Sequence, residues 1–152
     1  MKLTVFLALI LLFSKDLDRA NFYSVLANGE IDAIDNMLNS FKSLAFAGKD
    51  AFEGTLLMRK AGLMTVPARK LKLFKEGRIK LQTAIVNDST NAEFRFLRLI
   101  IQEQAPKIVN YRGQLSVDKQ YVIHSFPALP PEVKQAVSNY SKSSAVIKPE
   151  DL

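Results

Sequence analysis

The sequence predicts an all-α fold, a short array of antiparallel helix hairpins that follows an N-terminal signal peptide. Two observations support this prediction. Apolar residues recur at helical spacing along most of the chain, and no segment alternates apolar and polar residues between turn clusters as a strand would. A chain of 152 residues that is 48% hydrophobic and 24% charged can bury the core of one domain without metals or disulfides.

The first fourteen residues have the composition of a secretory signal peptide. Lys2 supplies a positive charge, and the apolar run Leu3–Phe13 is too short to span a membrane, which takes roughly 17 to 25 residues. We therefore expect residues 1–14 to be cleaved after Ser14, and the protein to be exported to the periplasm or the extracellular space. Leu12 is bulky for the cleavage pattern, so a buried first helix and a retained interfacial anchor stay open as alternatives.

Helix-capping residues mark three helices in the first half of the mature chain. Asp16 or Asp18 caps the first helix, and Asn28-Gly29 ends it. Apolar residues at i, i+3, i+7 and i+10 from Ile31 indicate the second. The third runs from Lys49 to Ala61.

Proline and polar residues bound the later helices, which begin near Pro67, Ala92, Ser116 and Pro131. We expect residues 15–141 to form a single helical domain. Residues 142–152 are predicted to be a flexible tail, because they are rich in serine and lysine.

Two glycines, Gly54 and Gly77, interrupt the apolar pattern inside predicted helices. Glycine costs a helix interior about 1 kcal/mol relative to alanine. We therefore expect both residues to permit a close approach between helices. Gly62, by contrast, is expected just beyond the end of the third helix.

Part of the chain resembles tetratricopeptide repeats. The segment Ala84–Glu93, AIVNDSTNAE, is similar to the joint between two such repeats, which commonly reads A-L-x-x-D-P-x-N-A-E, and residues 51–62 are similar to a repeat's first helix. Ser89 stands where the repeat has proline, and no second full copy follows at a period of about 34 residues. The resemblance implies tetratricopeptide-like helix pairs.

The chain as a whole resembles a family of uncharacterised exported bacterial proteins. The resemblance rests on Glu93–Arg98 (EFRFLR) with Gln102, and on Asp118-Lys119 ahead of Pro130. It implies a helical fold and secretion, and it implies no activity.

No motif in the sequence indicates catalysis. Cysteine is absent, which excludes a disulfide framework, a zinc–thiolate site and a thiol nucleophile. The single histidine, His124, follows Ser116 and Asp118, but no nucleophile elbow accompanies them. The chain also lacks phosphate-binding, dinucleotide-binding and metal-binding motifs. We predict no catalytic residues, no cofactor and no metal site, and keep an enzyme with an unrecognised site as the least favoured alternative.

The best candidate for a partner-binding site is a polar stripe on the fifth helix. Arg95, Arg98 and Gln102 are spaced i, i+3 and i+7 and therefore share one side of a helix. In a helical-repeat protein such a stripe lines the concave groove, and arginine can bind a carboxylate through two hydrogen bonds. The alternative is that Glu93 and Glu103 pair locally with these arginines.

A second candidate surface is the basic side of the fourth helix, where four cations lie opposite the apolar side: Arg69, Lys72, Lys75 and Lys80. With a net charge of +6, this side suits peripheral contact with an anionic envelope surface or polymer. A solvated helix face is the alternative. The chain has no tryptophan and does not alternate aromatic with basic residues, so nucleic acid is not expected as a partner.

These observations favour a non-catalytic protein- or peptide-binding scaffold module in the cell envelope, without a membrane span in the mature chain. A basic peripheral protein that docks on an anionic membrane surface is the alternative.

Overall fold

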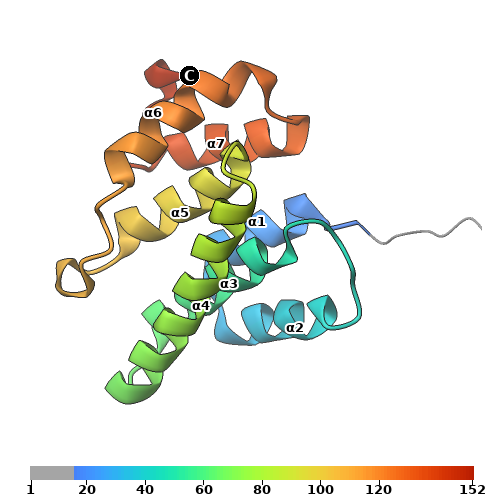
Figure 1. Cartoon of the computed structure of the whole chain (residues 1–152), viewed down its shortest axis with the longest axis vertical. Coiled ribbons are helices and arrows are strands. Elements are labelled where there is room, and N and C mark those ends of the chain that lie inside the picture. Colours follow the sequence, from blue (N-terminus) through green and yellow to red (C-terminus); the bar gives the residue numbers. More distant parts are fainter. Residues whose placement is uncertain (1–15) are drawn as a thin grey trace, which may run out of the picture.

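The computed structural model describes residues 16–152, and the predicted signal peptide, residues 1–14, lies outside the described residues. The described part is all-helical and contains no strand, which confirms the predicted fold class (Figure 1). Its elements are α1 (Arg19–Asn28), α2 (Ile31–Phe41), α3 (Lys49–Leu63), α4 (Pro67–Asn87), α5 (Ala92–Gln104), η1 (Lys107–Val109), α6 (Leu115–Ser125), η2 (Phe126–Ala128), α7 (Pro131–Ser141) and η3 (Pro149–Asp151). Among residues 16–152, no helix is long and apolar enough to cross a bilayer.

Local capping explains several helix ends. The Asp18 side chain accepts a hydrogen bond from the Asn21 amide at 3.0 Å at the start of α1, and Gly29 ends the helix with a φ of +67°. The Asn91 side chain caps α5 in the same way, accepting from the Phe94 amide at 3.2 Å. These ends follow from residues that lie next to them in the sequence.

One predicted helix end is wrong. Gly62 lies inside α3, which continues to Leu63, instead of terminating the helix. Its φ is not positive, and a Cβ built at this position would meet nothing within 4 Å. Gly62 therefore faces open space on the surface of α3.

The helices α3 and α4 form an antiparallel hairpin whose backbones touch. A Cβ at Gly54 would lie 2.5 Å from the carbonyl oxygen of Gly77, and a Cβ at Gly77 would lie 2.5 Å from the carbonyl oxygen of Gly54. Lys80 on α4 pairs with Asp50 on α3, so the chain directions are opposed. The predicted close approach at both glycines is confirmed, because a Cβ at either position would come so near to a backbone oxygen that the two helices would have to shift.

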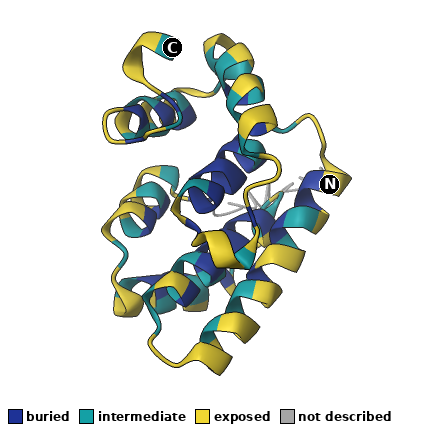
Figure 2. Cartoon of the chain, turned by 90° about the vertical axis from the view of Figure 1, so that its left-hand side faces the viewer, coloured by how far each residue is buried: buried dark blue, intermediate teal, exposed yellow. Residues whose placement is uncertain are grey.

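The helix α5 lies between the α3–α4 hairpin and the α6–α7 region and is buried on nearly every side (Figures 1 and 2). Nine of its thirteen residues are buried, which includes polar ones. Aromatic rings connect it to the N-terminal helices: Phe52 on α3 packs edge-to-face against Phe22 at 5.0 Å and against Phe94 at 6.1 Å. The buried apolar residues form one contiguous core around α5.

The C-terminal segment packs against the domain, in contrast to the flexible tail predicted for residues 142–152. Ile147 is fully buried in the core, and Ser144 is 3% exposed. The Glu103 carboxylate on α5 accepts hydrogen bonds from the Ser144 hydroxyl at 2.7 Å and from the Ala145 amide at 2.6 Å. The buried side chain of Ile147 and the Glu103 carboxylate of α5 thus hold this segment against the domain, although its composition alone suggested disorder.

Candidate partner-binding site

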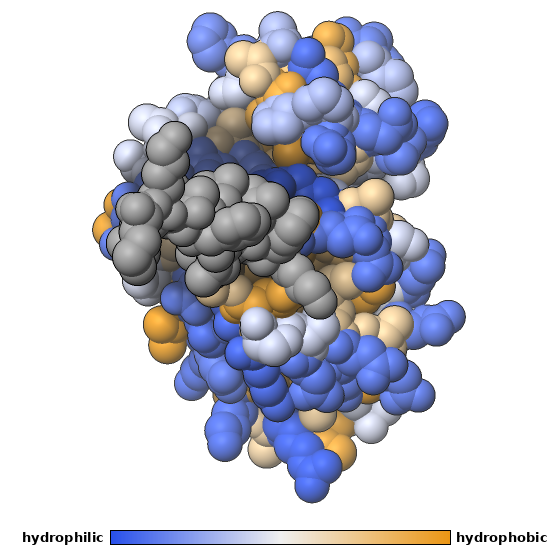
Figure 3. Space-filling view, turned by 90° about the vertical axis from the view of Figure 1, so that its right-hand side faces the viewer, coloured by the Kyte–Doolittle hydropathy of each residue, from blue (hydrophilic) through white to orange (hydrophobic). Residues whose placement is uncertain are grey.

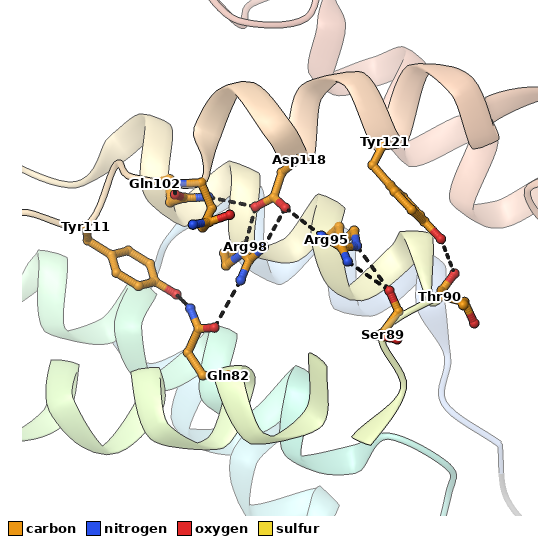
Figure 4. A network of polar contacts seen from close by, with 10 residues as sticks. Gln82, Ser89, Thr90, Arg95, Arg98, Gln102, Tyr111, Asp118 and Tyr121 are labelled. Carbon is orange, nitrogen blue, oxygen red and sulfur yellow. Dashed lines mark hydrogen bonds and ion pairs between the residues drawn. The ribbon is translucent and has the colours of Figure 1, made fainter. Parts of the chain in front are cut away.

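Arg98 and Gln102 lie in the interior of the protein rather than on its surface. The Nε and Nη2 atoms of Arg98 each donate to the carboxylate of Asp118 on α6 at 2.7 Å. The side-chain amide of Gln102 donates to the same carboxylate at 2.8 Å (Figure 4). Asp118 is completely buried, and Arg98 and Gln102 are 6% and 1% exposed. The three side chains connect α5 to α6.

The network continues to the α4 helix and to the loop after η1. Arg98 donates to the Gln82 side-chain oxygen at 3.0 Å, and the Gln82 amide donates to the Tyr111 hydroxyl at 3.1 Å (Figure 4). Burial raises the pKa of Tyr111, and the hydrogen bond from Gln82 opposes that rise. In the described residues, no buried side-chain nitrogen or oxygen lacks a partner. Each buried polar side-chain atom in this part of the chain therefore has a partner within the fold.

Arg95, the third residue of the predicted stripe, is also engaged. Its guanidinium lies 4.4 Å from the centre of the Tyr121 ring, and it donates to the Ser89 carbonyl oxygen at 2.9 Å. It also lies 3.5 Å from the Asp118 carboxylate. The i, i+3, i+7 spacing correctly placed the three residues on one side of α5, but that side faces α6.

The geometry therefore does not support the predicted partner-binding stripe. The reason is that the stripe faces the buried carboxylate of Asp118 instead of solvent. Sequence reasoning gave Asp118 no role in this site. Its spacing of four residues from the buried Val122 placed it on the inward side of α6, and this is the signal that identifies it. A fully buried carboxylate requires a buried cation and further donors, which Arg98 and Gln102 supply.

The local pairing of Glu93 and Glu103 with these arginines is not observed. Glu93 instead accepts hydrogen bonds from Arg19 at 3.0 Å and from Tyr23 at 3.1 Å, both on α1. Burial of Glu103 opposes its ionisation, but hydrogen bonds from the Ser144 and Tyr140 hydroxyls outweigh that effect and lower its pKa. Glu93 thus links α1 to α5, and Glu103 links the C-terminal segment to α5.

A groove on another part of the surface has a mostly apolar lining. It lies between α3, α4, the end of α5 and η1, and has a volume of about 370 Å³, within the range of about 300–1,000 Å³ typical of binding pockets. Phe74, Ile101 and Val109 form its covered lining, and Leu71 and Ile108 border it at 50% and 92% exposure. The loop that carries η1 projects beyond the end of α5 (Figure 1).

The charges around this groove are positive. Arg59 and Lys70 are among the lining residues, and within the described chain no carboxylate lines it. Arg59 donates to the Leu26 carbonyl oxygen at 3.0 Å, whereas Lys70 makes no ion pair within residues 16–152. Gly62 opens directly onto the groove.

The four basic residues predicted on α4 divide into two kinds. Lys80 is not available, because its ammonium group pairs with Asp50 and with Glu53, each at 3.0 Å. Arg69, Lys72 and Lys75 are exposed, and none of them pairs with a carboxylate of the described residues. On the face drawn in Figure 3, the surface that the undescribed residues leave visible is mostly hydrophilic, with apolar side chains among the polar ones.

Residues 16–152 contain no group of three or more histidine or carboxylate side chains that could hold a metal ion. Asp118 is committed to Arg98, and His124 is exposed on α6. No family model, no curated protein and no solved structure matches this chain.

Proposed function

We propose that this chain is a non-catalytic module that binds a protein or peptide partner in the groove between α3, α4, α5 and η1. The observation that carries the proposal is the groove itself, which is concave, apolar and bordered by cations. Contiguous exposed apolar surface of this kind commonly marks an interaction site. The expected signal peptide supports placing the module in the cell envelope.

The architecture favours this proposal over the polar stripe. Arg98 and Gln102 are buried and donate to Asp118, so neither side chain is accessible to a partner. The α3–α4 hairpin, with its Gly54–Gly77 contact, supports the idea of a degenerate tetratricopeptide-like pair. Helical hairpins of this class present grooves to extended or helical segments, and an acidic amphipathic segment would match the basic border.

Site-specific photo-cross-linking in the native host tests the proposal. A photoreactive residue in place of Ile108 lies at the edge of the groove. The control carries the same photoreactive residue in place of Val117 on α6, an apolar residue that is 54% exposed and lies outside the groove. We expect a discrete adduct at position 108 and none at position 117. Adding Gly62→Phe, which fills the groove, should abolish the adduct. Equal labelling at both positions, or an adduct that persists with Gly62→Phe, would overturn the proposal.

A further inference from the structure

The outward side of α4 carries a stripe of exposed residues that neither the core nor the groove uses. Residues spaced i, i+4, i+7, i+11, i+15 and i+18 lie on one side of a helix. On α4 this set is exposed throughout and forms what we call the α4 outer face: Ala68, Lys72, Lys75, Ile79, Thr83 and Val86. At a rise of 1.5 Å per residue it extends for about 27 Å.

Apolar side chains are concentrated on and beside this face. Ile79 is 67% exposed and Val86 is 78% exposed. Of the seven large hydrophobic residues that are exposed within residues 16–152, four lie on α4 or immediately before it: Val66, Leu71, Ile79 and Val86. The opposite side of α4 is packed against α3 through Gly77, so the outer face points away from the protein (Figure 1).

The positive charges of α4 are placed where they do not stabilise the helix. The first turn contains no acidic residue, although the helix dipole favours carboxylates there and disfavours cations. Arg69, Lys70 and Lys72 nevertheless lie close to this end, and Lys75 follows. None of them forms an ion pair with a described carboxylate. An anionic surface against the outer face would neutralise Lys72 and Lys75 and complement the positive end of the helix dipole, whereas Lys70 lines the groove.

We propose that the α4 outer face docks on an anionic phospholipid bilayer. On this face Lys72 and Lys75 come first and the aliphatic side chains Ile79 and Val86 follow, so one side of the helix offers both cations and apolar contact to a membrane interface. The lysine ammonium groups can reach lipid phosphates while Ile79 and Val86 reach the acyl boundary. A bilayer fits this face better than a protein does, because the apolar residues are spread along the helix and line no recess. This docking is independent of the proposed groove function.

Vesicle flotation with the full protein tests the assignment. Vesicles of phosphatidylcholine with phosphatidylglycerol should bind it at least tenfold more tightly than vesicles of phosphatidylcholine alone, and the binding should weaken at higher salt. Each cation near an anionic bilayer contributes roughly a fivefold change in affinity. The double variant Lys72→Glu/Lys75→Glu should therefore reduce binding at least tenfold, and Ile79→Asp should reduce it severalfold.

Matched variants separate the outer face from overall charge and from the groove. The control variant Lys134→Glu/Lys142→Glu changes the net charge by as much as Lys72→Glu/Lys75→Glu does, but at Lys134 in α7 and at Lys142 just after it. It should leave most of the vesicle binding intact. Gly62→Phe should leave vesicle binding unchanged while it abolishes the groove adduct, so failure of one proposal is distinct from failure of the other. The bilayer assignment is overturned by equal loss in both charge-reversal pairs or by absence of binding to phosphatidylglycerol. It is also overturned if an acidic peptide binds through the α4 lysines and the vesicles do not.

Discussion

A methyl group added at Gly54 should destabilise the protein, although alanine is the better helix former. The new Cβ would lie 2.5 Å from the Gly77 carbonyl oxygen and 2.8 Å from the Leu81 amide nitrogen. Both contacts are with backbone atoms, which cannot rotate away, so α3 and α4 must move apart. Overpacking of this kind costs about 1–3 kcal/mol, and we expect the upper part of that range.

The helix propensity gained by alanine offsets part of that cost, by about 1 kcal/mol. We therefore expect Gly54→Ala to lower the free energy of unfolding by about 1–2 kcal/mol. Gly62→Ala is the matched control, because it lies in the same helix with no heavy atom within 4 Å of its Cβ. It should raise the free energy of unfolding, by up to about 1 kcal/mol.

Urea denaturation followed by far-ultraviolet circular dichroism measures both changes. The two substitutions are chemically identical, so only their surroundings can give them opposite signs. A Gly54→Ala variant as stable as the wild type would refute the close α3–α4 contact. If Gly54→Ala and Gly77→Ala act on one shared contact, their double variant should lose less stability than the sum of the single variants.

Three further predictions concern the internal polar contacts. Asp118→Asn should cost about 3–5 kcal/mol in urea denaturation, because it leaves the Arg98 charge buried without its counterion, and the apolar pair Asp118→Leu/Arg98→Met should recover much of that loss. The lowered pKa of Glu103 means that its stabilising effect is present above its ordinary pKa and is lost as the pH falls through the lower pKa of the folded state. The difference in stability between wild type and Glu103→Gln should therefore be full at neutral pH and shrink well below about pH 4, and a difference that grows on acidification would contradict the assigned direction. Lys80→Met should cost about 0.2–1 kcal/mol in thermal or urea melts through its two ion pairs, whereas Lys75→Met should change stability by less than about 0.5 kcal/mol.

The features of the fold that the sequence predicted are those set by neighbouring residues. Asp18, one of the two cap candidates, and Pro67 act on the helix turn next to them, so local sequence indicated where α1 and α4 begin. Gly54 and Gly77 were informative for a different reason. Glycine is unfavourable inside a helix, and the contact between α3 and α4 explains why it occurs at both positions.

The features that the sequence did not predict depend on distant partners. Arg98 finds its carboxylate twenty positions away, on another helix, and helical spacing does not tell whether a polar stripe faces solvent or a buried aspartate. The C-terminal segment is fixed by Glu103, which lies 41 residues before Ser144. Composition suggested disorder there, because the burial of Ile147 depends on the completed core.

If partners bind in the groove, the polar stripe on α5, which holds the fold together, should take no part in binding. The most direct measurement is the affinity of the partner recovered by cross-linking for two variants, each checked for stability by urea denaturation. Gly62→Phe should bind the partner at least tenfold more weakly while it stays folded, and Asp118→Leu/Arg98→Met should bind it as tightly as the wild type does. Normal binding by Gly62→Phe together with lost binding by a folded Asp118→Leu/Arg98→Met variant would contradict the account.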